Sequence, residues 1–348
     1  MPKLVSRLRA SAPDSFLAAL AVALVFVTFL VVDQKHWWQL KPDYTFGWLV
    51  PAFVVFIVYD RWAKFQVLFR VAGPSPLPRL TQAVLRVVAG LILASGLVAF
   101  LFGAVYRAGA GATQPGSLAL AIGFAGVLLG MVYFNTPDGQ VGEVTGWCAF
   151  RTDARLRVTA LFLFPALIWV LSAPLMSSVE STISLFLLRK VVVVVFTLFS
   201  LLGFPLVQEG NVLILPHGQV GVADACSGIR SLTGCLFAGS FLSAVFMDRL
   251  WKKVALVAAA LVFAFFTNLL RSLFLTGWAY AYGSEAIEGT LHDATGYAVL
   301  GLTCVGLFGL MPLFNGANWR RWLGTESAAV IGKKAETDLA GVPAATRR

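Results

Sequence analysis

A thiol, a carboxylate and a guanidinium stand close together in the stretch 222–232, which reads VADACSGIRSL. Cys226 is the potential nucleophile, Asp224 precedes it and Arg230 follows it. The stretch begins a long apolar run, and polar side chains at a membrane boundary cost free energy, so they usually serve a function. Only the thiolate of a cysteine attacks an electrophile, and a free thiol with a pKa of about 8.5 is only slightly ionised at neutral pH. Nucleophilic chemistry at Cys226 would therefore need a base and a cation nearby.

Two later residues could fill these roles. Arg271 ends the tetrapeptide NLLR near the end of one apolar run, and His292 begins the pentapeptide HDATG in the loop just before the next run. An imidazole can accept the thiol proton. A guanidinium can stabilise either the thiolate or the oxyanion of a tetrahedral intermediate. Together with Cys226 these residues form the candidate catalytic set.

The residue types alone leave alternatives open. Arg230, one helical turn after Cys226, could replace Arg271 as the cationic partner, and Arg271 could instead extend its charge to the membrane surface. Cys226 could be a small buried residue. The charge of Asp224 would raise the thiol pKa, so Asp224 is expected to cap the helix or to pair with Arg230.

The choice of base is also open, because His36 and His217 are expected on the same side of the membrane as His292. These histidines could in principle bind a metal together with Asp224 and Cys226, but no paired ligand spacing supports such a site. The four cysteines of the chain contain no CxxC pair and no zinc spacing. No cofactor and no metal are therefore predicted.

The composition indicates an integral membrane protein. Of the 348 residues, 58% are hydrophobic and 13% are charged, whereas about a quarter of the residues in a soluble chain are charged. The net charge of +10 could suggest nucleic acid as a partner, but the chain offers no soluble basic face to hold it. An excess of cations in cytoplasmic loops explains the charge better.

The apolar runs predict an all-α polytopic protein with eight crossings and both ends in the cytoplasm. The segment 178–204 contains Arg189 and Lys190, and each buried cation costs about 2.5–3.5 kcal/mol on insertion scales. We therefore expect 178–204 to lie on or dip into the outer leaflet. A small hairpin is predicted from two β-like runs, 211–215 and 219–222, on either side of a turn. The expected crossings are about 15–32, 48–59, 83–102, 117–134, 158–175, 225–247, 254–275 and 295–314.

Charge counting orients the bundle. The N-terminus, the basic loops at 60–82, 135–157 and 248–253, and the polar tail 315–348 together hold 19 of the 27 Lys and Arg residues, and these segments are placed inside. The tail is predicted to be disordered. Cys226, Arg271 and His292, from three consecutive helices, are then expected to meet at similar depth on the outer side.

At this point the residues resemble the exosortase/archaeosortase family of transpeptidases. The matching pieces are DACSGIRSL (224–232), NLLR (268–271) and HDATG (292–296), with an earlier piece, DYTFGWLVP (43–51). The earlier piece departs from the usual His-Gly-Phe-Leu before Val-Pro, which leaves the subtype open. The resemblance covers about residues 40–315 and implies one transmembrane domain over 1–314.

The resemblance implies a reaction and a location. Cys226 would attack a peptide bond in the C-terminal sorting signal of an exported protein and form a thioester, Arg271 would stabilise transition-state charge, and His292 would act as general acid and base. Supporting roles are expected for Asp224, Ser227, Arg230 and Asn268. The substrate signal would consist of a short motif such as Pro-Glu-Pro, a hydrophobic helix and a basic cluster. A polysaccharide or lipid of the envelope would accept the acyl group. The site would face outward from the plasma membrane, and the histidine favours the bacterial exosortase branch.

Two other classes of function remain as alternatives. A membrane transporter fits many helices and an intramembrane arginine, but no inverted repeat or pair of broken helices is visible. A non-enzymatic factor for exopolysaccharide assembly would not need the candidate catalytic residues at all.

Overall fold

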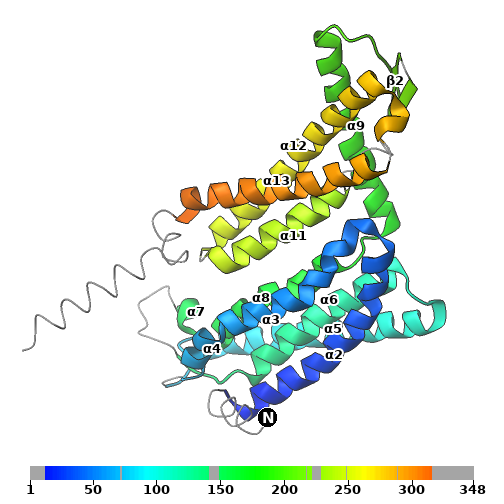
Figure 1. The fold of residues 1–348 in the computed structure, drawn as a ribbon. Coiled ribbons are helices and arrows are strands. Elements are labelled where there is room, and N and C mark those ends of the chain that lie inside the picture. The colour runs from blue at the N-terminus through cyan, green and yellow to red at the C-terminus, as the bar shows by residue number, and fades with distance from the viewer. Residues whose placement is uncertain are drawn as a thin grey trace, which may run out of the picture.

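A computed structural model of the chain describes residues 12–70, 73–140, 149–216, 218–221, 229–247, 249–287 and 289–315. These residues are mostly helical (Figure 1). Within them, nine helical segments are long and apolar enough to cross a bilayer. The predicted tail at 316–348 and the N-terminal residues 1–11 lie outside the described part of the chain.

The N-terminal half begins with a long helix and a bent second crossing. Its first elements are α2 (Asp14–Leu40), η1 (Pro42–Leu49), α3 (Val50–Asp60) and α4 (Trp62–Phe69). Helix α2 ends where Lys41 takes an extended conformation, since a residue before proline disfavours the helical region. The expectation of a plain loop over 60–82 is wrong for α4, which buries Phe65 and Leu68 on one helical face.

Helices α5 (Arg79–Ala110) and α6 (Gln114–Asn135) form the closest helix pair. Helix α5 runs past the expected end at 102 and stops at Gly111, whose φ of 75° favours glycine. The side chain of Thr113 caps α6 by accepting a hydrogen bond from the Gly116 amide. Glycines of both helices face the partner backbone, so the two axes can approach closely.

Helix α8 (Ala154–Ser172) is capped by Asp153, whose side chain accepts from the Leu156 amide at 3.0 Å. The short helix α7 (Ala149–Thr152) precedes it. Helix α9 (Ser177–Leu201) follows and contains the two cations that argue against a crossing.

Helix α9 begins and ends on the same side of the bundle. At its start, Glu180 pairs with Lys41 at 2.7 Å and accepts from Gln114 at 3.2 Å, and these two residues mark the end of α2 and the start of α6. After its end the chain enters the sheet, which packs on η3 (Ser284–Ile287) and the last turns of α12 (Leu250–Tyr282). In Figure 1, α9 runs across the end of the bundle rather than along it. Helix α9 thus lies across one end of the bundle, an arrangement that agrees with the eight predicted crossings.

The predicted hairpin is present and has one strand more than expected. Strands β1 (Val207–Glu209), β2 (Val212–Leu215) and β3 (Gly218–Gly221) pair antiparallel in the order β1-β2-β3. We call this side of the bundle the sheet end. The opposite side, which carries α4 and α7, is the basic end.

The C-terminal half consists of three consecutive crossings. They are α11 (Ile229–Phe246), α12 (Leu250–Tyr282) and α13 (Thr290–Asn315). Helix α12 extends beyond the expected 275 to Tyr282, where Gly283 with a φ of 90° ends it. Figure 1 shows these three helices as a group beside the group formed by α2 to α8.

The bent crossing η1–α3 joins the two groups. Phe53 of α3 stacks on Phe241 of α11 with ring centroids 4.0 Å apart, and Phe46 of η1 packs on Phe237 at 4.8 Å. Near the basic end, the buried Arg61 donates to the carbonyl oxygens of Leu161 in α8 and Ala244 in α11. The join brings η1 next to the first turn of α11, where the candidate catalytic residues were expected.

Candidate active site

Arg271 is buried near the sheet end of α12 and is held by the first turns of α13. Arg271 is only 7% exposed to solvent. Nε donates to Thr295 Oγ1 at 3.2 Å, and Nη2 donates to the backbone carbonyl of His292 at 2.9 Å. The Thr295 hydroxyl in turn donates to the same His292 carbonyl at 2.9 Å. This triangle fixes the guanidinium against the α13 backbone.

Arg230 lies in the first turn of α11 and faces η1. Its Nε is 3.5 Å from Oδ1 of Asp43, and both side chains are partly buried. One turn further along α11, the Thr233 hydroxyl donates to the Asp43 carbonyl at 2.9 Å. These two contacts join the start of η1 to the start of α11. Asp43 and Thr233 are 190 positions apart in the chain.

The two guanidinium groups converge on Gly296 of α13. A Cβ atom placed on Gly296 would lie 3.7 Å from Arg230 Nη1 and 3.7 Å from Arg271 Nη2. Two cations so close repel each other, and the Asp43 carboxylate beside Arg230 offsets part of this charge. The arrangement favours a bound anion, and the N-terminus of α13 adds its dipole in the same direction.

Asn268 lies one turn before Arg271 on the same helix. It is 4% exposed, and its Oδ1 has no hydrogen-bond partner among the described residues. The same holds for the hydroxyl of Ser272. Buried polar atoms without partners are uncommon, so α12 carries unused hydrogen-bonding capacity beside the guanidinium.

The structure brings together part of the predicted set. Arg271 and His292 meet at the sheet end, and Arg230 joins them there. His292 was expected in a loop, but this is wrong: α13 begins at Thr290, which places His292 in its first turn. His36 lies on an exposed face of α2, with its ring beside Trp37. The remaining residues of the prediction lie outside the described part of the chain. They are Asp224, Cys226, Ser227 and the alternative base His217.

Sequence reasoning gave no role to Asp43 or Thr295, which hold the two arginines. Both residues lie in stretches that carry the resemblance, the first piece at 43–51 and the last at 292–296. The types and positions of Asp43 and Thr295 could therefore be read from the sequence. Their contact partners could not be predicted, because each contact joins segments far apart in the chain.

Comparison with known families identifies the chain. The model of the transmembrane exosortase family matches residues 37–309, which is most of the chain and includes every described residue of this site. The chain belongs to the transmembrane exosortase family. Neither the curated proteins nor the solved structures contain a match to it. The exosortase is thus a multi-pass membrane protein with a membrane transpeptidase-type function, and the helix bundle agrees with this membership.

Proposed function

We propose that this exosortase is a cysteine-dependent transpeptidase that cleaves C-terminal sorting signals of exported proteins. The observation that carries the proposal is the convergence of Arg271, Arg230 and the His292 backbone at the start of α11. Cys226 precedes Ile229, the first described residue of α11, by three positions. In the sequence, residues 222–228 lie between β3 and α11, and β3 and the first turn of α11 both lie at the sheet end.

The proposed reaction has two steps. In the first, the Cys226 thiolate attacks the carbonyl carbon of the scissile peptide bond, and the oxyanion that forms is stabilised by Arg271. The C–N bond then breaks, the imidazole of His292 delivers a proton to the leaving amine, and the acyl group remains on sulfur as a thioester. In the second, an acceptor nucleophile from the envelope attacks the thioester, gives up its proton, and releases the thiolate.

The neighbouring residues support these roles. Arg230, paired with Asp43, adds positive charge that lowers the pKa of a nearby thiol. Asn268 supplies a buried amide one turn from Arg271. Asp224 and Ser227 are proposed to support the nucleophile from its own segment.

The proposed substrate side of the site is extracytoplasmic. The basic end holds the loops in which Lys and Arg concentrate, and such loops remain in the cytoplasm. The sheet end would then face outward from the plasma membrane, where exported proteins emerge. A hydrophobic signal helix would enter laterally from the lipid, and α9 and the sheet are the proposed lid because they lie across this end.

A reporter experiment tests the proposal. An exported reporter that ends in a short motif, an apolar helix and a basic cluster is produced with wild-type enzyme, Cys226→Ala or the matched control Cys304→Ala. We expect Cys226→Ala to lower processing at least about a thousandfold, while Cys304→Ala processes normally. Mass spectrometry of the wild type should reveal an acyl-enzyme that hydroxylamine releases. Normal processing by an inserted Cys226→Ala enzyme would remove the claim.

A further inference from the structure

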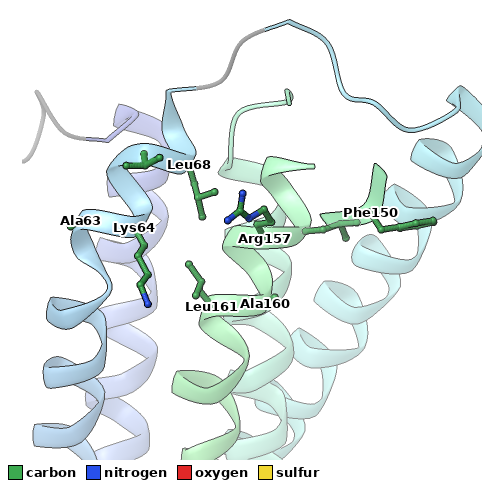
Figure 2. Close-up of a pocket in the computed structure, with 9 residues that line it drawn as sticks. Ala63, Lys64, Leu68, Phe150, Arg157, Ala160 and Leu161 are labelled. Carbon is green, nitrogen blue, oxygen red and sulfur yellow. The ribbon is translucent and has the colours of Figure 1, made fainter. Parts of the chain in front are cut away.

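A groove lies at the basic end, on the opposite side of the molecule from the candidate active site. Its volume is about 930 Å³, and it separates α4 from α8, with Phe150 of α7 at its edge (Figure 2). Most of its lining is apolar, and the two exceptions are Lys64 on α4 and Arg157 on α8. Figure 2 shows the Arg157 side chain directed from α8 toward Leu68, while Lys64 extends along the groove.

Within the described part of the chain, the two cations of the groove form no ion pair. The described ion pairs include neither Lys64 nor Arg157. No Asp or Glu lines the groove. The third cation of this region, Arg61, is buried and committed to the carbonyl oxygens of Leu161 and Ala244.

Two described carboxylates near the groove, Asp153 and Asp138, are already engaged. Asp153 accepts from the Leu156 amide and from the Ser75 hydroxyl, and Asp138 pairs with Arg86 and Arg155. Asp60 is exposed, next to Arg61 rather than in the groove lining. The groove therefore combines an apolar wall with uncompensated positive charge at the boundary of the apolar helices.

A second cavity shares part of the apolar lining of the groove. A crevice of about 330 Å³ lies between α5, α6 and α8, and its lining shares Leu156 and Ala160 with the groove. Its other walls are almost entirely aliphatic, with Tyr133 and Thr159 as the polar exceptions. An apolar chain entering at the groove could thus follow the surface of α8 into the bundle.

We propose that this groove binds an anionic phospholipid, with its phosphate between Lys64 and Arg157 and an acyl chain along Leu156 and Ala160. Basic pockets between transmembrane helices are suited to acidic lipid headgroups. An acidic peptide would satisfy the charge but would not use the aliphatic crevice. A free phosphate would use neither apolar surface. The site is independent of the proposed catalysis, because its residues lie at the other end of the bundle.

The test uses the full-length protein in detergent. Native mass spectrometry counts bound dioleoylphosphatidylglycerol, with dioleoylphosphatidylcholine for comparison, on wild type, on Lys64→Gln/Arg157→Gln, and on the control Arg70→Gln/Arg79→Gln. The control removes the same charge at the same end from exposed residues outside the lining. We expect retention of phosphatidylglycerol to weaken roughly 30-fold in the groove variant, at about a fivefold loss per cation, and to be unchanged in the control.

A second measurement separates the lipid from other anions and does not depend on the charge variants. Wild-type thermal stability should rise with phosphatidylglycerol, but not with phosphatidylcholine or inorganic phosphate. Ala160→Phe, which adds a bulky ring at a residue that lines both the groove and the crevice, should reduce the effect of the lipid. Equal retention by groove and control variants, equal stabilisation by inorganic phosphate, or preference for an acidic peptide would each overturn the proposal.

Discussion

Arg271 combines burial with unused hydrogen-bonding capacity. Nε and Nη2 are held by Thr295 and by the His292 carbonyl, whereas Nη1 has no hydrogen-bond partner among the described residues. A guanidinium has five N–H donors in a rigid fork. The side chain is therefore fixed on one edge and free to bind an anion on the other, which is what stabilisation of an oxyanion requires.

The anchor of Arg271 gives a first prediction. Thr295→Val keeps the side-chain shape but removes the hydroxyl that accepts from Nε, and hydrogen bonds to charged groups contribute about 1.5–3 kcal/mol. Reporter processing should slow by at least about tenfold, whereas Thr295→Ser should retain most of the rate. The measurement is the initial processing rate in membranes with matched enzyme levels. If Thr295→Val also lowers the thermal midpoint strongly, the anchor is structural rather than specific to the reaction.

A second prediction separates the two arginines, which residue type alone left open. Arg271 uses the fork of its guanidinium to reach Thr295 and His292 together, and lysine cannot reproduce this geometry. Arg230 makes an ion pair with Asp43, which lysine can retain. Arg271→Lys should lower processing by about 100-fold, and Arg230→Lys by less than about tenfold. The reverse order would identify Arg230 as the cation of the transition state.

Sequence reasoning located the polar residues of the site better than their partners. Charge counting and the apolar runs placed Arg271 and His292 at the same end, because both lie at helix ends that must face one side. The contacts of Asp43 and Thr295 could not be deduced in this way. They depend on how η1 meets α11 and how α13 lies against α12, which tertiary packing decides.

Secondary-structure elements that depend on tertiary contacts were also missed from the sequence. Long apolar helices were predicted correctly because their composition dictates them. Helix α4 was missed, since basic and proline residues around it resemble a loop, and its stability comes from burying Phe65 and Leu68. Strand β1 was missed because three residues carry little periodicity, and only pairing with β2 defines them.

The packing of α5 on α6 gives a third prediction. Gly126 and Gly130 of α6 both face α5: a Cβ on Gly126 would lie 2.9 Å from the Ile92 carbonyl oxygen, and one on Gly130 would lie 2.6 Å from Leu93 Cβ. A Cβ on Gly123 would lie 2.7 Å from Phe100 Cα, which is backbone and cannot yield easily. Gly123→Ala should therefore destabilise the protein by about 1–3 kcal/mol.

A matched glycine on α5 controls this experiment. Gly109 is also helical, but a Cβ there would meet nothing within 4 Å. Gly109→Ala should be neutral or slightly stabilising, because glycine in a helix costs about 1 kcal/mol relative to alanine. Thermal unfolding in detergent, read by the solubility of the protein after heating, compares the two variants. Equal midpoints would show that the α5–α6 contact tolerates a methyl group.

The assembly of the candidate site depends on whether the number of membrane crossings before α11 is even or odd. Helix α9 is apolar and long enough to span a membrane by composition. Nevertheless, its first turn pairs with Lys41 at the end of α2, and the chain after it returns to the sheet beside α12. If α9 crossed, α11 would have to begin at the basic end, and Arg230 could not reach Asp43. The two ion pairs at the sheet end thus favour eight crossings.

Cysteine labelling tests this parity directly and gives a fourth prediction. In a background without the native cysteines, single cysteines replace Ser178 before the middle of α9 and Glu209 after it, and both positions are exposed. A membrane-impermeant maleimide added to intact cells should label both if α9 lies across the outer face, as proposed. Lys64→Cys at the basic end should react only after the membrane is permeabilised. Labelling of only one of the first two positions would mean that α9 crosses the bilayer. That result would place the two halves of the candidate site on opposite sides, and the proposed transpeptidase could not be assembled.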